Sequence, residues 1–207
     1  MTPLPSGMGA ENSIACVVVA RSHWQLSTQA GCQLVIAGYP PFRYDARGGG
    51  GISAVQANDG DGANVIPLDF SAHDLVIPPL DAARGRFLGL PLPPGLSIQI
   101  HPERLAGELN PLTGALRLQF RSRFRLTLGS ANTPLYQASD LLVDTALTSG
   151  EVSSRRHQRT GRALSADGTA TLVGTAAIEP CREAWLNRFL GLPDEALAVM
   201  HLTLRPL

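Results

Sequence analysis

The stretch LRLQFRSRFRLTL, Leu116–Leu128, decides the fold class of this 207-residue chain. Apolar residues occupy alternate positions through it, with Ser122 as the only polar member of that set. Because successive side chains of a β-strand point to opposite faces of a sheet, the pattern predicts one long strand with an apolar face and a basic face. The basic face would carry four guanidinium groups, those of Arg117, Arg121, Arg123 and Arg125.

The rest of the chain shows the same strand pattern. Its apolar segments are short, alternate or rich in β-branched residues, and they end at Gly, Pro, Asn or Asp. The expected strands are Ile14–Ala20, Gln33–Ala37, Ile52–Gln56, Val65–Phe70, Asp74–Ile77, Leu96–His101, Leu116–Leu128, Leu141–Thr148, Ala170–Ile178 and Leu197–Leu204. So many strands with hardly any helix predict an all-β fold, an antiparallel β-sandwich or barrel. No polar linker divides the chain, so we expect a single domain over residues 1–207.

The hexapeptide RFLGLP occurs twice, at Arg86–Pro91 and at Arg188–Pro193. A Gly followed by Leu and Pro is typical of a helix stop, because Gly adopts the left-handed C′ conformation and Pro prevents the helix from resuming. Each copy ends a short helical pattern, and these patterns are Asp81–Leu88 and Cys181–Leu190. The match extends without a gap over 74–103 and 176–205, which predicts two similar halves, each with one short helix. The alternative is a coincidence in a chain rich in Leu, Gly and Pro.

Composition and charge exclude some classes of protein. The chain has 17 basic and 17 acidic residues, no net charge and 5% aromatic residues, so we expect no nucleic-acid partner. Its three cysteines, Cys16, Cys32 and Cys181, form no CxxC pair, which favours a reducing compartment. The N-terminal residues lack the pattern of a signal peptide, and no apolar run approaches the ~20 residues of a membrane span. We therefore expect a cytoplasmic location.

Four segments carry a resemblance to a known group of proteins. They are LVIPPLD (75–81), GRFLGLPLPP (85–94), YQASDLLVDTALTSG (136–150) and FLGLP (189–193). Over roughly residues 65–207 the chain resembles a group of uncharacterised proteins of cyanobacteria and plant chloroplasts. The resemblance implies a photosynthetic source and a location in the cytoplasm or plastid stroma, peripheral to the thylakoid membrane. It implies no catalytic residue.

A second basic cluster follows the Arg-rich strand, in SSRRHQRTGR at 153–162. The expected anion-binding residues of the two clusters are Arg117, Arg121, Arg123, Arg125, Arg155, Arg156, Arg159 and Arg162. Guanidinium groups bind phosphates and carboxylates, so the leading hypothesis is a non-enzymatic binding or assembly protein. Its partner would be an anionic membrane surface or an acidic protein. The alternative is an ordinary solvated face, with acids such as Asp140 and Asp144 supplied by neighbouring strands.

Two further functions remain open. A barrel interior lined by the apolar face could carry an apolar small molecule, a lipid or a pigment. An enzyme could use a His–carboxylate pair, and the candidates are His101 with Glu103 and His73 with Asp74. No hydrolase, metalloprotease or nucleotide-binding motif is present, so no catalytic residue, cofactor or metal site is assigned.

Two other segments deserve a structural interpretation. The segment NDGDG, Asn58–Gly62, lacks the Glu of a calcium loop and is expected to be a mobile turn. Cys181 is the candidate for a reactive thiol, because a helix start lowers the pKa of a thiol there. A structural role for Cys181 is the alternative.

Overall fold

A computed structural model describes residues 23–54, 65–130 and 133–207 of the chain. These residues form fifteen β-strands and one short helix, so the predicted all-β, antiparallel fold is confirmed. The expected strand Ile14–Ala20, the end of the expected strand Ile52–Gln56 and the loop Asn58–Gly62 lie outside the described residues.

The strands close into a ring, which corresponds to the barrel among the two expected architectures. The long strand β15 pairs with β14 along one edge and with β1 along the other, where Trp24–Thr28 faces Leu202–Pro206. Each neighbouring pair in the ring is antiparallel. In ring order the strands are β1 (Trp24–Thr28), β4 (Gly50–Ala54), β5 (Ile66–Phe70), β8 (Leu96–Leu109), β9 (Leu116–Gly129), β11 (Leu141–Thr148), β14 (Thr169–Ile178) and β15 (Asp194–Pro206).

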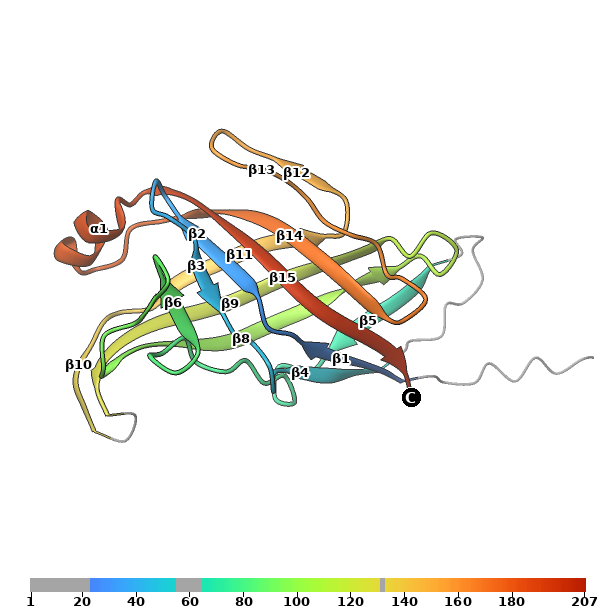
Figure 1. Ribbon diagram of the computed structural model, residues 1–207, viewed down its shortest axis with the longest axis horizontal. Coiled ribbons are helices and arrows are strands. Elements are labelled where there is room, and N and C mark those ends of the chain that lie inside the picture. Colours follow the sequence, from blue (N-terminus) through green and yellow to red (C-terminus); the bar gives the residue numbers. More distant parts are fainter. Residues whose placement is uncertain (1–22, 55–64, 131–132) are drawn as a thin grey trace, which may run out of the picture.

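A second branch of the sheet extends the ring at one end. It starts where β2 follows β1 along the same edge of β15, and it continues through β3, β6 and β7. These strands are β2 (Cys32–Ile36), β3 (Phe42–Tyr44), β6 (Gly85–Phe87) and β7 (Leu90–Pro91). The remaining strands are β10 (Pro134–Gln137), which pairs with β9, and the hairpin of β12 (Glu151–Ser153) and β13 (Gln158–Thr160). Figure 1 shows the β2–β3 turn, β6, β10 and the helix at the end opposite the C-terminus.

The second RFLGLP ends a helix, as the sequence predicts. The helix α1 spans Ala184–Leu190, and Gly191 follows it in the left-handed conformation with φ 71°. The N–H groups of Gly191 and Leu192 both donate to the carbonyl oxygen of Asn187, which closes the helix end. Gly191 and Leu192 of this copy therefore act as the expected stop signal.

The helix expected over Asp81–Leu88 is absent, and that prediction is wrong. The carboxylate of Asp81 accepts hydrogen bonds from the backbone of Ala83 and Arg84, so the segment begins as a turn. The chain then enters β6, which pairs with β3, and Leu88–Gly89 forms the tight turn to β7 with φ 51° and 84°. Strand pairing with a distant segment overrides the local helical pattern, so the two copies differ in structure.

The Arg-rich stretch forms β9, and its predicted alternation is confirmed along most of its length. Leu116 and Leu118 are buried, and the arginines between the apolar residues point outward. The single polar residue of the inner face, Ser122, is fully buried and donates a hydrogen bond to the carbonyl oxygen of His101. The alternation ends near the strand terminus, where Thr127 is buried and Leu128 is exposed.

Candidate functional site: the hollow apolar end of the ring

The interior of the ring is filled at one end and hollow at the other. At the filled end, large side chains from most strands form one cluster, which includes Leu26, Leu68, Phe70, Leu116, Leu118, Leu172, Leu202 and Leu204. Along β14 and β15, the inward side chains then become small. These small inward residues are Gly174, Ala176, Ala196 and Ala198. Ala176, Ile178 and Ala196 form a second, smaller cluster at this end. Because small side chains leave volume unoccupied, this end of the interior is packed less fully than the other.

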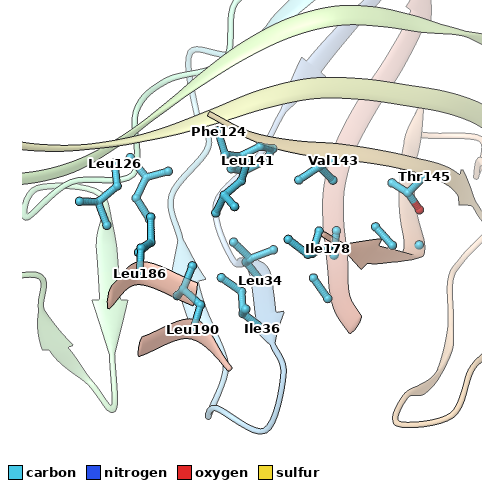
Figure 2. A pocket seen from close by; sticks show the side chains of 15 residues that line it. Leu34, Ile36, Phe124, Leu126, Leu141, Val143, Thr145, Ile178, Leu186 and Leu190 are labelled. Atoms are coloured by element: carbon cyan, nitrogen blue, oxygen red, sulfur yellow. The ribbon is translucent and has the colours of Figure 1, made fainter. Parts of the chain in front are cut away.

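Two adjoining cavities occupy the hollow end. The inner cavity has a volume of about 130 Å³ and reaches the leucine cluster, and the outer cavity has a volume of about 70 Å³. Leu34, Phe124 and Ala198 line both cavities, so only side chains separate them. Figure 2 shows the outer cavity, where residues of β2, β9, β11 and α1 converge. An apolar cavity of about 150 Å³ stays dry and binds benzene or xenon, so these volumes match small apolar molecules.

The three hydroxyl groups that reach the cavities donate hydrogen bonds to backbone carbonyl oxygens. Thr28 donates to the carbonyl oxygen of Ala46, and Thr145 donates to that of Thr175 at 2.8 Å. Tyr44 donates to the carbonyl oxygen of Pro78, and burial raises the pKa of Tyr44. Among the described residues, no charged side chain lines either cavity. The interior is therefore suited to an uncharged, apolar occupant.

The helix α1 covers the hollow end. Leu186 is fully buried and lines the outer cavity together with Leu190, while Trp185 and Phe189 on the adjacent face are exposed. Figure 2 shows Leu186 and Leu190 facing Leu34 of β2. One short helix thus separates the outer cavity from solvent on this side.

Two of the predicted anion-binding arginines share one carboxylate. Arg121 contacts Glu103 at 2.9 Å, and Arg123 contacts the same carboxylate at 2.5 Å. A register shift between Pro102 and Arg104 leaves Glu103 as the extra residue of a β-bulge, which places it among the outward arginines. Partial burial opposes ionisation of Glu103, but the hydrogen bonds from the two arginines outweigh it and lower its pKa.

The other arginines of β9 differ in their partners. Arg125 donates two hydrogen bonds to Asp140, at 2.6 Å and 2.8 Å, and these bonds lower the pKa of Asp140. Asp144 lies 3.8 Å from Arg121. Arg117 forms no ion pair with any residue of the described ranges. Asp140 and Asp144 therefore supply charge to this face, as considered from the sequence.

The second basic cluster lies on and beside the β12–β13 hairpin. Arg155 and Arg156 both contact Asp194 of β15, at 3.1 Å and 2.8 Å. A backbone hydrogen bond and Arg156 lower the pKa of Asp194. Within the described part of the chain, Arg159 has no ion pair, and Arg162 reaches only the hydroxyl of Thr169, at 3.5 Å. Anion binding by the two clusters stays a prediction. Most of their arginines already form ion pairs with carboxylates of the protein.

The other candidate residues do not form a site. His101 and His73 are exposed, and Glu103 is held by arginines instead of His101. Cys181 precedes α1, and its thiol donates to the side chain of Asn187. The described residues contain no cluster of three His, Cys, Asp or Glu side chains that could hold a metal ion.

Sequence reasoning missed the residues that make the interior hollow. The signal was present in GTAAI at 174–178 and in ALAVM at 196–200, where four of the inward residues, Gly174, Ala176, Ala196 and Ala198, are Gly or Ala. Both segments read equally well as closely packed strands. Only the positions of the facing residues on β9 and β11 show that nothing fills the space.

No protein-family model matches this chain, and no curated protein or solved structure matches it. The resemblance of residues 65–207 to proteins of cyanobacteria and chloroplasts stays a prediction. Within the described ranges, no helix has the length and apolar character needed to cross a membrane. The fold and the cavities define the class: an antiparallel ring of strands with a hollow apolar end under a short helix.

Proposed function

We propose that this protein binds or carries an apolar small molecule in the hollow end of its strand ring. The observation that carries the proposal is the pair of uncharged cavities of about 130 Å³ and 70 Å³, separated only by side chains. Unfilled apolar volume lowers stability, because the lining atoms lose contacts that a filled core would have. An apolar ligand restores those contacts, which gives the small residues of β14 and β15 a function.

The size of the cavities limits the ligand. A single ring or a short branched or acyl segment fits the described volumes, and movement of Phe124 would join them for a longer one. The expected location, in the cytoplasm or the plastid stroma beside the thylakoid membrane, is part of this proposal. A lipid or a pigment fragment is the matching class of ligand.

Filling the cavity from inside tests the proposal. Ala198→Leu places a larger side chain where the two cavities meet, and Ala177→Leu makes the same change on the exposed outer face of β14. The uncharged fluorescent probe N-phenyl-1-naphthylamine has two ring systems and would occupy both cavities once movement of Phe124 joins them. We expect it to bind the wild type and Ala177→Leu equally, and Ala198→Leu at least about tenfold more weakly. Equal binding of the probe by all three proteins would contradict the proposal.

The Arg-rich surface remains a separate hypothesis with its own test. If that surface is the binding site, substitution of Arg121, Arg123 and Arg125 by Gln should abolish binding to anionic vesicles at low salt. The carboxylates that contact Arg121, Arg123 and Arg125 leave less free charge than the sequence indicates. The cavities therefore support ligand binding better than the arginines support anion binding.

A further inference from the structure

The helix α1 has an inner face and an outer face with different surroundings. Leu186 and Leu190 face the outer cavity, while Trp185 is 47% exposed and Phe189 is 57% exposed. Residues four positions apart lie on one face of a helix, so Trp185 and Phe189 form a single apolar edge in water. An exposed apolar patch of this kind is typical of a surface that contacts a membrane or another protein.

Aromatic side chains from other elements extend this edge into an arc. Trp185 lies 5.8 Å from Tyr136 of β10 between ring centres, and its Nε1 donates to the Tyr136 hydroxyl. Phe189 lies 6.1 Å from Tyr39 in the turn between β2 and β3. Immediately after that turn, Phe42 of β3 stacks on Phe87 of β6 at 4.5 Å. The arc contains one of the two Trp, two of the three Tyr and three of the six Phe of the chain.

Large aliphatic side chains project from the same end. Leu88 and Leu90 flank the tip of the β6–β7 hairpin and are each 70% exposed, and Leu135 of β10 is 91% exposed. Figure 1 shows α1, β6 and β10 at this end, opposite the C-terminus. The aromatic arc and these three leucines are called the α1 face below. The α1 face lies at the end of the ring where α1 lines the outer cavity.

The arginines at this end are not neutralised, unlike most of those on β9. Arg43 and Arg86 are both exposed and lie directly opposite each other on β3 and β6. Like charges at such positions repel. Within the described residues, Arg86 donates hydrogen bonds to backbone carbonyl oxygens alone. Arg182 and Arg188 beside and within α1 are exposed as well. None of these four forms an ion pair with a residue in the described ranges.

The acids near the α1 face do not supply the missing partners. Glu183 accepts hydrogen bonds from the backbone and hydroxyl of Ser139, which lower its pKa. Asp81 accepts from backbone N–H groups, and Glu179 is exposed at the end of the segment before α1. The α1 face therefore combines apolar side chains with the unpaired arginines Arg182 and Arg188 beside and within α1. Arg43 and Arg86 point to the side of β3 and β6 opposite to Phe42 and Phe87.

We propose that the α1 face docks on a lipid bilayer that contains anionic head groups. Trp and Tyr favour the interface between head groups and acyl chains, exposed leucines enter the acyl region, and arginines attract anionic head groups. Because α1 covers the cavity, docking would place its lid against the source of an apolar ligand. This last step rests on the proposed function, whereas the docking itself does not.

Binding to vesicles tests the docking, with Trp185 as the reporter. Trp24 is removed first by Trp24→Phe, because its buried Nε1 has no hydrogen-bond partner to lose. With vesicles of equal parts phosphatidylcholine and phosphatidylglycerol, we expect a blue shift of the remaining Trp emission and co-flotation of the protein. The double variant Trp185→Ala/Phe189→Ala, followed by flotation alone, should lose at least about tenfold in vesicle partitioning.

Matched variants distinguish binding through the α1 face from nonspecific adsorption of exposed apolar or basic side chains to vesicles. Leu135→Ala should weaken partitioning, whereas Leu112→Ala, at a 76% exposed leucine in the turn between β8 and β9, should not. Arg182→Gln/Arg188→Gln should weaken binding to anionic vesicles more than Arg117→Gln/Arg159→Gln does, although both double variants remove two arginines without a described ion pair. Equal effects of both leucine variants, no binding to vesicles, or a dimer that buries Trp185 would overturn the proposal. Probe binding by the double aromatic variant should persist, which separates this test from that of the cavity.

Discussion

At the scale of single residues, the arginines of β9 show what alternation predicts and what it leaves out. The alternating pattern predicted that their side chains lie on the outer face. Asp140 and Asp144 were the acids expected near them, and ion pairs with Arg125 and Arg121 confirm both. It did not reveal Glu103, because that residue reaches the arginines only through a bulge in β8. The sequence did contain a sign of the bulge: the apolar residues of this strand fall at even positions up to Ile100 and at the odd position Leu105 after it.

The ion pairs predict a ranking of arginine substitutions. Arg125→Gln removes two hydrogen bonds to a partly buried Asp140 and should lower the free energy of unfolding by up to about 1 kcal/mol. Arg117→Gln removes no described ion pair and should leave it unchanged. Urea denaturation of both variants measures the difference, and equal stabilities would show that the Arg125–Asp140 pair contributes nothing.

Several carboxylates predict a loss of stability in acid. Hydrogen bonds from Ser165 and Thr169 lower the pKa of Asp167 to about 2, below the ordinary value of 3.8. A lowered pKa in the folded state means that the ionised carboxylate stabilises the fold above pH 3.8, and this contribution disappears as the pH falls through about 2. Melting temperatures across this range should fall with pH, and less steeply in Asp167→Asn. An identical slope for the variant would contradict the assignment.

At the scale of elements, RFLGLP shows that six identical residues do not fix one structure. Both glycines adopt the expected left-handed conformation, with φ 84° at Gly89 and 71° at Gly191. The preceding residues form a strand in one copy and a helix in the other, because β3 offers a pairing edge to the first copy alone. Local sequence thus predicted the turn, and the tertiary pairing decided the element.

The helix stop predicts a change in the lid. Gly191→Ala puts a Cβ in the left-handed conformation and should lower the free energy of unfolding by about 1 kcal/mol. It should also speed release of the fluorescent probe, because α1 covers the outer cavity. Gly89→Ala carries the same backbone strain at the β6–β7 turn and should leave the release rate unchanged in stopped-flow measurements. Equal release rates in the two variants would show that α1 does not control access.

At the scale of the whole molecule, the ring could be predicted only as one of two architectures. Its closure depends on β1 pairing with the C-terminal half of β15, and no local pattern specifies a contact across that much sequence. The same holds for the hollow end, where residues from β2, β8, β9, β11, β14, β15 and α1 meet. The sequence therefore allowed a carrier function but identified no residue that would bind the ligand.

The contrast between the two ends predicts opposite responses to a change of volume. Leu172→Ala at the filled end removes a fully buried side chain and should cost about 2–5 kcal/mol of unfolding free energy. Ala198→Leu at the hollow end adds a similar volume and should leave stability equal or raise it. Chemical denaturation compares the two. Marked destabilisation by Ala198→Leu would mean that the space around it is already filled.

The most direct measurement is native mass spectrometry of the protein as purified, beside Ala198→Leu and Ala177→Leu. The account predicts an additional mass on the wild type and on Ala177→Leu that is lost on denaturation, extracts into organic solvent and is missing from Ala198→Leu. An additional mass that is retained in Ala198→Leu, or a wild type that stays empty after incubation with apolar probe, would contradict a ligand site inside the ring.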